Sequence, residues 1–180
     1  MTFTESTLAG AYTIEMTRIE DERGFFARSY CAQEFAAHGL PADMPECSVS
    51  FNARRGTLRG MHFQSAPHTE DKLVRCTAGG IFDVIVDLRA GSPTLRQWFG
   101  AELTSENRRS LFIPKGFAHG FITLCDATEV LYMISVPYVS GFERGVRWND
   151  PALAIEWPMD PVVISARDAA YPLLGATTIA

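Results

Sequence analysis

The 180-residue sequence has no apolar run long enough to cross a membrane. Such a span needs roughly 18 consecutive apolar residues, and no stretch of the chain reaches that length. The N-terminal segment, residues 1–10, contains acidic Glu5 and no basic stretch before an apolar run, which differs from a signal peptide. These absences predict a cytoplasmic protein that has no membrane partner.

Positive charge is not in excess either. The formal net charge is −5 and the isoelectric point is about 5.4. A general nucleic-acid-binding protein needs a basic surface, so the charge balance argues against a nucleic-acid partner. It leaves room for a local group of arginines that binds a small anion.

The usual spacings of metal ligands are missing as well. The cysteines form no CxxC pair, which argues against a zinc ribbon or a thioredoxin-like site; they are Cys31, Cys47, Cys76 and Cys125. A metal site built on H-x-H is also broken, because Gly60 and Gln64 stand where a second histidine would flank His62. We expect no metal, and cysteines that are reduced and structural.

The chain does contain short segments in which apolar and polar residues alternate, separated by glycine or proline turns. Two runs within residues 73–93 meet at Gly79-Gly80, two more within residues 108–124 are separated by Pro114 to Gly116, and another covers residues 129–139. Hydrophobic residues make up 47% of the chain and charged residues 21%, as in ordinary globular proteins. The pattern predicts a single mainly-β domain spanning the whole chain, an antiparallel sandwich or barrel.

Only two short helices are expected. Residues 32–40 have Phe35 on one face and Gly39 in a position to end a helix. A second short helix fits near residues 166–174. The predicted helices are therefore few and peripheral to the strands.

The stretch GTLRGMHFQ, residues 56–64, is unusual for a structural strand. Alternation places His62 on one face, together with Leu58, Gly60 and Gln64, and places Arg59 on the other face, together with Met61 and Phe63. Gly60 would leave room for a ligand to approach the imidazole, which could then act as a base. The alternative is a core histidine whose hydrogen bonds are satisfied.

Four other residues have side chains suited to acid–base chemistry, and each has an ordinary alternative. His119 lies in an apolar strand context, like His62, and Lys72 stands where a strand begins and could be a solvated surface group. Tyr132 points where an aliphatic residue is expected, although buried tyrosines commonly just find a hydrogen-bond acceptor. Asp168 could orient a histidine or cap the short helix near it.

Arginines near these residues suit a phosphate. Arg23 precedes a glycine in DERGFF, Arg59 lies close to His62, and Arg167 adjoins Asp168. A planar guanidinium can donate two charge-assisted hydrogen bonds to a phosphate group. The three arginines indicate a phosphate site only if the fold brings them together.

Eight segments follow one another over about residues 18–175: DERGFF, GTLRGMHFQ, DKLVRC, VDLRAGSPT, FIPKGFAHGF, LYMISVPY, VRWNDPALAIEWP and SARDAAYPLL. In order and spacing they resemble the dTDP-4-dehydrorhamnose 3,5-epimerase family. The resemblance implies a cupin-like antiparallel β-jelly-roll, and a homodimer in which N-terminal strands add to the partner's sheet. It also implies an epimerase without a cofactor in rhamnose-like deoxysugar biosynthesis. The implied substrate is a nucleotide-diphosphate 4-keto-6-deoxyhexose, of the dTDP-4-dehydro-6-deoxyglucose type.

The resemblance further implies a role for each acid–base residue. His62 matches the family's base, and Asp168 matches the carboxylate that fixes its tautomer. Lys72 matches the cation that stabilises negative charge on the C4 oxygen, and Tyr132 matches the acid on the far face of the sugar. A ketone at C4 acidifies the protons on C3 and C5, so such a set could invert either centre through an enolate.

Other positions match the family's substrate-binding residues. Arg59 and Arg23 match ligands of the diphosphate, His119 matches a further substrate contact, and Tyr138 matches an aromatic residue near the nucleoside. The rest of the implied binding set, to which Lys72 also belongs, is Glu143, Arg167, Arg28, Cys47, Ser48 and Val49.

Two departures from the family pattern concern the nucleotide. Arg28 stands where many members have Glu, and Cys47 and Val49 replace the Gln and Asn of a QDNHS-like stretch. Lost hydrogen-bond partners would weaken selection for thymine, unless Arg28 points to solvent and other residues read the base. Two alternatives stay open: an epimerase of C3 or C5 alone on a non-thymidine nucleotide sugar, and a cupin that binds a nucleotide sugar without turnover.

Overall fold

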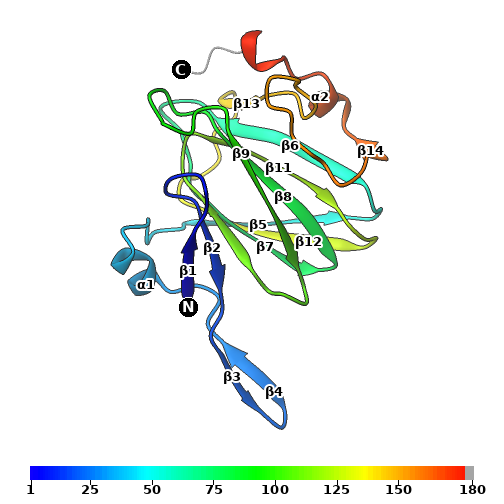
Figure 1. Cartoon of the computed structure of the whole chain (residues 1–180). Helices are drawn as coiled ribbons and strands as arrows, with labels where there is room; N and C mark the ends of the chain where they lie inside the picture. Colours follow the sequence, from blue (N-terminus) through cyan, green and yellow to red (C-terminus); the bar gives the residue numbers. More distant parts are fainter. Residues whose placement is uncertain (177–180) are drawn as a thin grey trace.

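Short strands separated by turns stack into two facing sheets, from which one hairpin projects (Figure 1). The structure, a computed structural model, describes residues 1–176. The strand order of the first sheet is β1 (Thr2–Glu5), β2 (Tyr12–Glu15), β10 (Ser110–Ile113), β7 (Lys72–Ala78), β12 (Thr128–Ile134) and β5 (Glu46–Asn52). All neighbouring strands in this sheet are antiparallel.

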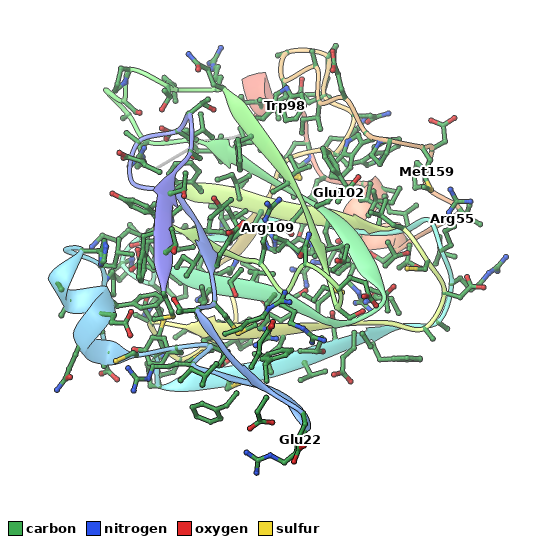
Figure 2. All side chains as sticks on the ribbon, turned by 60° about the horizontal axis from the view of Figure 1, so that its bottom comes forward. Glu22, Arg55, Trp98, Glu102, Arg109 and Met159 are labelled. Carbon is green, nitrogen blue, oxygen red and sulfur yellow. The ribbon has the colours of Figure 1, made fainter. Side chains whose placement is uncertain are left out.

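The second sheet covers the first. Its order is β13 (Glu143–Gly145), β6 (Thr57–Gln64), β11 (Phe117–Thr123), β8 (Gly80–Asp87) and β9 (Trp98–Thr104), and β14 (Val163–Ile164) pairs in parallel with β6. The hairpin consists of β3 (Arg18–Asp21) and β4 (Gly24–Ala27) and points away from both sheets (Figure 1). Side chains occupy the space between the sheets, whereas Glu22 at the hairpin tip stands apart from them (Figure 2).

The predicted turns lie where glycine and proline place them. β7 and β8 meet at Gly79, whose φ of +74° is left-handed and where an added Cβ would lie 2.5 Å from the Thr128 hydroxyl. The segment from Pro114 to Gly116 separates β10 from β11. These turns bring consecutive strands back across the sandwich, so the glycine and proline pattern correctly locates the strand ends.

The core lies between the two sheets. Val74 and Cys76 of β7 and Val130 of β12 meet Ile85 of β8 and Phe121 of β11, and all five are nearly or fully buried. Because successive strand residues face opposite ways, one face of each sheet supplies this core. The other face of the second sheet packs a further buried cluster, in which Val84, Val86 and Ala118 meet Val146 and Leu153. The prediction of a mainly-β antiparallel jelly-roll is confirmed.

The helices are short and peripheral, as predicted. They are α1 (Ala32–Ala37), α2 (Ala166–Ala169) and the 3₁₀ helix η1 (Leu174–Ala176). α1 buries Phe35 against Leu73 and Phe112 on the outer face of the first sheet, and left-handed Gly39 follows its end. The helix is shorter than the predicted span of residues 32–40. Within residues 1–176, no helix has the length and apolar content needed to cross a bilayer.

All four cysteines are free thiols, but their surroundings differ. Cys76 is buried in the core, whereas Cys47 and Cys125 are exposed. The expected structural role therefore fits Cys76 and does not fit Cys47 or Cys125.

A buried carboxylate closes the end of β8. Asp87 is fully buried and accepts two hydrogen bonds from the Arg89 guanidinium, at 2.9 and 2.7 Å. The hydroxyls of Ser92 and Thr94 donate to it at 2.6 and 2.7 Å. Burial alone would raise the pKa of Asp87, but these donors outweigh it and lower the pKa to about 2. The carboxylate thereby ties the loop after β8 to the sheet.

We expect Asp87→Asn to destabilise the fold by roughly 2 to 4 kcal/mol at pH 7, because it removes the charge that the Arg89 guanidinium faces. A folded pKa below the ordinary value of 3.8 stabilises the native state above pH 4, and this contribution of roughly 2 kcal/mol disappears as pH falls towards 2. Urea unfolding at pH 7 and pH 2.5 measures both effects. The parent should lose more stability than the variant on acidification. The exposed Asp160→Asn serves as the control.

Candidate active site

A bulge in β6 arranges the residues of the GTLRGMHFQ stretch. Opposite β11, His62 pairs with His119 and Arg59 pairs with Phe121, so β6 carries one extra residue between the two pairs. The extra residue interrupts the alternation, and Arg59 and His62 line the same cavity. The prediction that they occupy opposite faces is therefore wrong, because strict alternation assumes a regular strand.

Gly60 sits in this bulge for a different reason from the one predicted. Its φ is +129°, and an added Cβ would lie 2.5 Å from the Cα of Gly120 and 2.9 Å from the carbonyl oxygen of His119. The absent side chain therefore allows β11 to approach β6, rather than clearing space for a ligand beside His62. Its N–H donates to Asp168 Oδ2 at 3.2 Å.

A cavity of about 370 Å³ opens between the two sheets. Strands of the first sheet and strands of the second both contribute polar side chains to it. Most of the predicted site residues line this cavity: Ser48, Val49, Arg59, His62, Lys72, His119, Tyr132, Tyr138, Glu143 and Arg167.

His62 is held by a buried carboxylate. Its Nε2 lies 2.8 Å from Oδ1 of Asp168, which is 5% exposed. Burial would raise the pKa of Asp168, but the hydrogen bond and charge of His62, followed by the Gly60 N–H, lower it below its ordinary value. An ionised Asp168 accepts a hydrogen bond from the Nε2–H of His62, so the neutral imidazole has its lone pair on Nδ1. Ser165, and not Asp168, caps α2, so the orienting role is the one the geometry favours.

Tyr132 approaches the cavity from the facing sheet. It extends from β12, packs against the core and lies 3.3 Å from the Ser50 hydroxyl through its own oxygen. Burial is the main reason that the pKa of Tyr132 is raised well above its ordinary value. The phenol therefore stays protonated over the whole neutral range and is available as a proton donor.

Lys72 is not the solvated surface group that its position at a strand start allowed. Its side chain is 12% exposed, and Nζ lies 2.7 Å from Oε1 of Glu70, which is 9% exposed. Both side chains line the cavity. A buried ammonium group thus stands on the same sheet as Tyr132 and faces the sheet that carries His62.

His119, like His62, contacts a buried carboxylate. Its Nε2 lies 2.7 Å from Oδ1 of Asp83, a fully buried residue of β8. The His119 ring stands edge-on to the Tyr132 ring, with the centroids 6.2 Å apart. Asp83 was not among the predicted residues, although a lone acid within the apolar run IFDVIV was a signal that it has a buried partner.

Two arginines supply positive charge at the cavity. Arg59 donates through Nε to Asn52 Oδ1 at 2.7 Å and through Nη2 to the Phe51 carbonyl oxygen at 3.4 Å, which anchors its guanidinium at the cavity. Arg167 donates to the Tyr171 hydroxyl at 2.8 Å, and this bond raises the pKa of Arg167. Both residues also line a second hollow that adjoins His62 and Asp168. The cavity therefore has a cationic side suited to a phosphate.

Tyr138 and Glu143 lie at the open side of the cavity. Tyr138 is 55% exposed, and its hydroxyl donates to Glu143 Oε1. This bond lowers the pKa of Glu143 and raises that of Tyr138. An exposed aromatic face beside the cavity offers a surface on which a planar base can stack.

The chain matches the dTDP-4-dehydrorhamnose 3,5-epimerase family over residues 5–176. It belongs to this family. A relative of that name from Salmonella typhimurium is 46% identical over 156 residues, which cover 86% of this chain and 85% of the relative. The solved dTDP-4-dehydrorhamnose 3,5-epimerase of Bacillus anthracis, with TDP and PPi bound, is 42% identical with a TM-score of 0.93, and covers 96% of this chain and 99% of that one.

A third comparison is with dTDP-6-deoxy-D-glucose-3,5-epimerase of Legionella pneumophila, solved in complex with dTDP-4-keto-L-rhamnose. It is 38% identical, has a TM-score of 0.92, and covers 98% of this chain and 94% of that one. The agreement in fold confirms the cupin-like jelly-roll that the motifs implied. The family is one of isomerases.

Three of the residues matched to this epimerase family lie away from the cavity within one chain. Arg23 is at the tip of the β3–β4 hairpin, where it bonds Asp21, and its side chain is 84% exposed. Arg28 pairs with Glu34 of α1 at 3.2 Å. Cys47 is exposed and does not line the cavity. Their predicted contacts with substrate would need a second copy of the chain.

Some cavity residues of this family member were not predicted. Glu46 and Ser50 lie on the same face of β5 as Ser48, and alternation along ECSVSFN was the signal that could have found them. Glu70 precedes Lys72 in a loop, where no periodic pattern applies. Asn52, whose Oδ1 accepts from Arg59, is 2% exposed. Its apolar neighbours in the sequence indicate that Asn52 is buried, but not that it bonds Arg59.

Proposed function

We propose that this chain is an epimerase that inverts C3 and C5 of a nucleotide-diphosphate 4-keto-6-deoxyhexose through an enolate. The observation that carries the proposal is the placement of a base and an acid on facing sheets of one cavity. The His62–Asp168 pair comes from the sheet of β6, and Tyr132 comes from the sheet of β12. A sugar ring between them would meet a base on one face and an acid on the other.

The proposed proton steps balance without a cofactor. Nδ1 of His62 takes the proton from C3 or C5, and the electron pair of the broken C–H bond forms the enolate with the C4 oxygen. Tyr132 then gives its hydroxyl proton to the opposite face of the same carbon, and the enolate electron pair forms the new C–H bond. Solvent returns a proton to the Tyr132 phenolate and removes one from the His62 imidazolium, which resets the site.

Charge is distributed to match such a substrate. The Lys72 ammonium would donate to the C4 oxygen as it becomes negative, and His119 would bond a sugar oxygen. Arg59 and Arg167 would hold the diphosphate, Tyr138 would stack on the base, and Glu143 would fix the Tyr138 ring. Ser48 and Val49 line the same side of the cavity as Tyr132.

Incubation in deuterated water tests the function directly. The substrates would be dTDP-4-keto-6-deoxyglucose and its CDP, GDP and UDP counterparts, with NMR reporting which carbons exchange. We expect deuterium at both C3 and C5 and an inverted product, with the dTDP sugar accepted, as the names of the relatives suggest. Exchange at one carbon would assign a single-centre epimerase. Tight binding with no exchange would assign a non-catalytic binding protein and contradict the proposal.

A homodimer is part of this proposal, and the hairpin supports it. Ile19 and Phe26 face the same side of β3–β4 and are 68% and 73% exposed. Val49 and Phe51 on β5 are 56% and 60% exposed, and within residues 1–176 β5 pairs only with β12. A partner's hairpin lying along β5 would cover both apolar surfaces and the free strand edge. It would also bring Arg23 and Arg28 of the partner copy near the cavity, on the side of Cys47.

We expect the parent to scatter light as a dimer and Phe51→Asp to shift it to a monomer with at least ten-fold lower activity at equal concentration. A charge placed in an apolar interface costs a few kcal/mol, which is enough for such a shift. The control is Leu95→Asp, an exposed apolar residue in the loop after β8. A parent that is monomeric and fully active would contradict the dimer.

A further inference from the structure

Glu70 makes the closest contact to the Lys72 ammonium, and the proposed proton steps give it no role. It lies in the loop before β7, and its Oε1 is 2.7 Å from Lys72 Nζ. The two side chains are 9% and 12% exposed, so water competes little for either group. A lysine side chain has four rotatable bonds, and an ammonium group that must meet a developing oxyanion needs something to fix it.

The second oxygen of Glu70 is fixed as well. Gln64 donates through Nε2 to Glu70 Oε2 at 2.6 Å, and Gln64 Oε1 accepts from the backbone N–H of Val139 at 3.2 Å. Gln64 is 5% exposed. A continuous series of contacts thus runs from the Val139 backbone through Gln64 and Glu70 to Lys72. Each Glu70 oxygen already bonds a protein donor, so this carboxylate is placed to act on Lys72 rather than on a substrate.

We propose that Glu70 is a positioning residue that aims the Lys72 ammonium at the C4 oxygen of the substrate, with Gln64 holding Glu70 in place. The proposal rests on the proposed function, in which Lys72 meets that oxygen. Of the three N–H bonds of the ammonium, one is directed to Glu70, and the other two remain for the cavity. No proton is transferred at Lys72, which stays a hydrogen-bond donor while His62 and Tyr132 exchange protons with carbon.

This arrangement also explains why Gln64 faces inward at the end of the GTLRGMHFQ stretch. An amide has both a donor and an acceptor, so it can receive the Val139 N–H on one side and donate to a carboxylate on the other. A carboxylate at position 64 would oppose Glu70, and an apolar residue would leave the Val139 N–H and one Glu70 oxygen without partners. The inward amide is therefore matched to the charge of Glu70.

The test uses Glu70→Gln, which keeps the shape of the side chain and removes its charge. Its amide cannot accept from both Lys72 and Gln64, so one of the two contacts is lost. We expect kcat to fall roughly ten- to a hundred-fold, as for a misplaced catalytic group, with KM changed less than about two-fold.

The double variant Q64E/E70Q restores every contact by exchanging the amide and the carboxylate. The carboxylate introduced at position 64 would accept from the Val139 N–H and from the amide N–H introduced at position 70. The amide carbonyl at position 70 would then accept from Lys72. This variant should recover most of the kcat that Glu70→Gln loses.

A double-mutant cycle with Lys72→Met separates positioning from other effects. If Glu70 acts through Lys72, then Glu70→Gln has no further effect on exchange at C3 and C5 in the Lys72→Met background. Glu15→Gln is the control, since Glu15 pairs with Arg109 at the same 2.7 Å but both side chains are about half exposed and away from the cavity. It should keep parental kcat.

Three outcomes would overturn the proposal: parental kcat in Glu70→Gln, no recovery in Q64E/E70Q, or an equal loss in the Lys72→Met background. The melting temperature of each variant shows whether activity is lost through unfolding. Recovery of kcat in Q64E/E70Q then distinguishes a loss of folding from a loss of Lys72 positioning. An active Lys72→Met would instead contradict the role of Lys72 in the proposed function. The two failures are therefore distinguishable.

Discussion

His62→Ala should lower the rate of solvent exchange at both C3 and C5 by about 10²- to 10⁴-fold, the usual effect of removing a general base. One imidazole serves both centres in the proposed reaction, so the two exchange rates should fall together. NMR of the 4-keto sugar in deuterated water measures them separately. Asp168→Asn should give a smaller loss of the same kind, because an amide no longer fixes the proton on His62 Nε2, which now donates a hydrogen bond to Asp168.

The matched control for this experiment is His38→Ala. His38 is exposed at the end of α1 and stacks on Phe3, away from the cavity. Its variant should keep parental exchange at both carbons. If His62→Ala also exchanges at the parental rate, His62 is not the base. If exchange falls at one carbon alone, a second base serves the other carbon, and the single-base reaction is wrong.

Tyr132→Phe should separate exchange from inversion. The variant keeps the base and loses the proton donor on the facing sheet, so abstraction continues while delivery to the opposite face stops. We expect deuterium to enter with retained configuration, returned from the side of His62, and the inverted product to form about 10²-fold or more slowly. NMR resolves both products from their ring couplings. The raised pKa of Tyr132 predicts that inversion by the parent enzyme shows no loss from phenol ionisation between pH 7 and 9.

The comparison for Tyr132→Phe is Tyr12→Phe on β2, which packs on the outer side of the first sheet. That variant should invert at the parental rate. Parental inversion by Tyr132→Phe would remove Tyr132 as the donor. Equal loss of exchange and inversion would mean that Tyr132 positions the sugar instead of protonating it.

Much of the fold could be predicted because its signals are local. The turn at Gly79, the break from Pro114 to Gly116 and the burial of Phe35 each depend on a few neighbouring residues. The order of strands was less accessible, because it depends on distant partners. β2 lies beside β10, and β5 lies at the edge next to β12. The projecting hairpin β3–β4 carries exposed apolar residues, and the burial of apolar side chains within one chain does not explain them.

The site was predicted mainly through motifs, and its supporting residues were missed. His62, Tyr132, Lys72 and His119 line one cavity, as the family resemblance implied. The carboxylates that bond His119 and Lys72 were not predicted. Asp83 lies behind His119 and carries no sequence signal beyond an acid in an apolar run, whereas Glu70 lines the cavity but lies in a loop, where no periodic pattern marks it. The predictions for Arg23, Arg28 and Cys47 depend on a second chain and stay predictions.

The amino-acid sequence by itself determined the residue types, the strand rhythm and the turns, since these follow from short-range alternation and from glycine and proline. Only the tertiary structure decided that Arg59 and His62 share a cavity, because the bulge that turns them to one side exists through the close approach of β11 at Gly120. It also decided that Asp168, 106 residues further along the chain, hydrogen-bonds His62, whereas Ser165 caps α2. Alternation is a property of one strand, whereas a bulge and a buried ion pair are properties of the partner that packs against it.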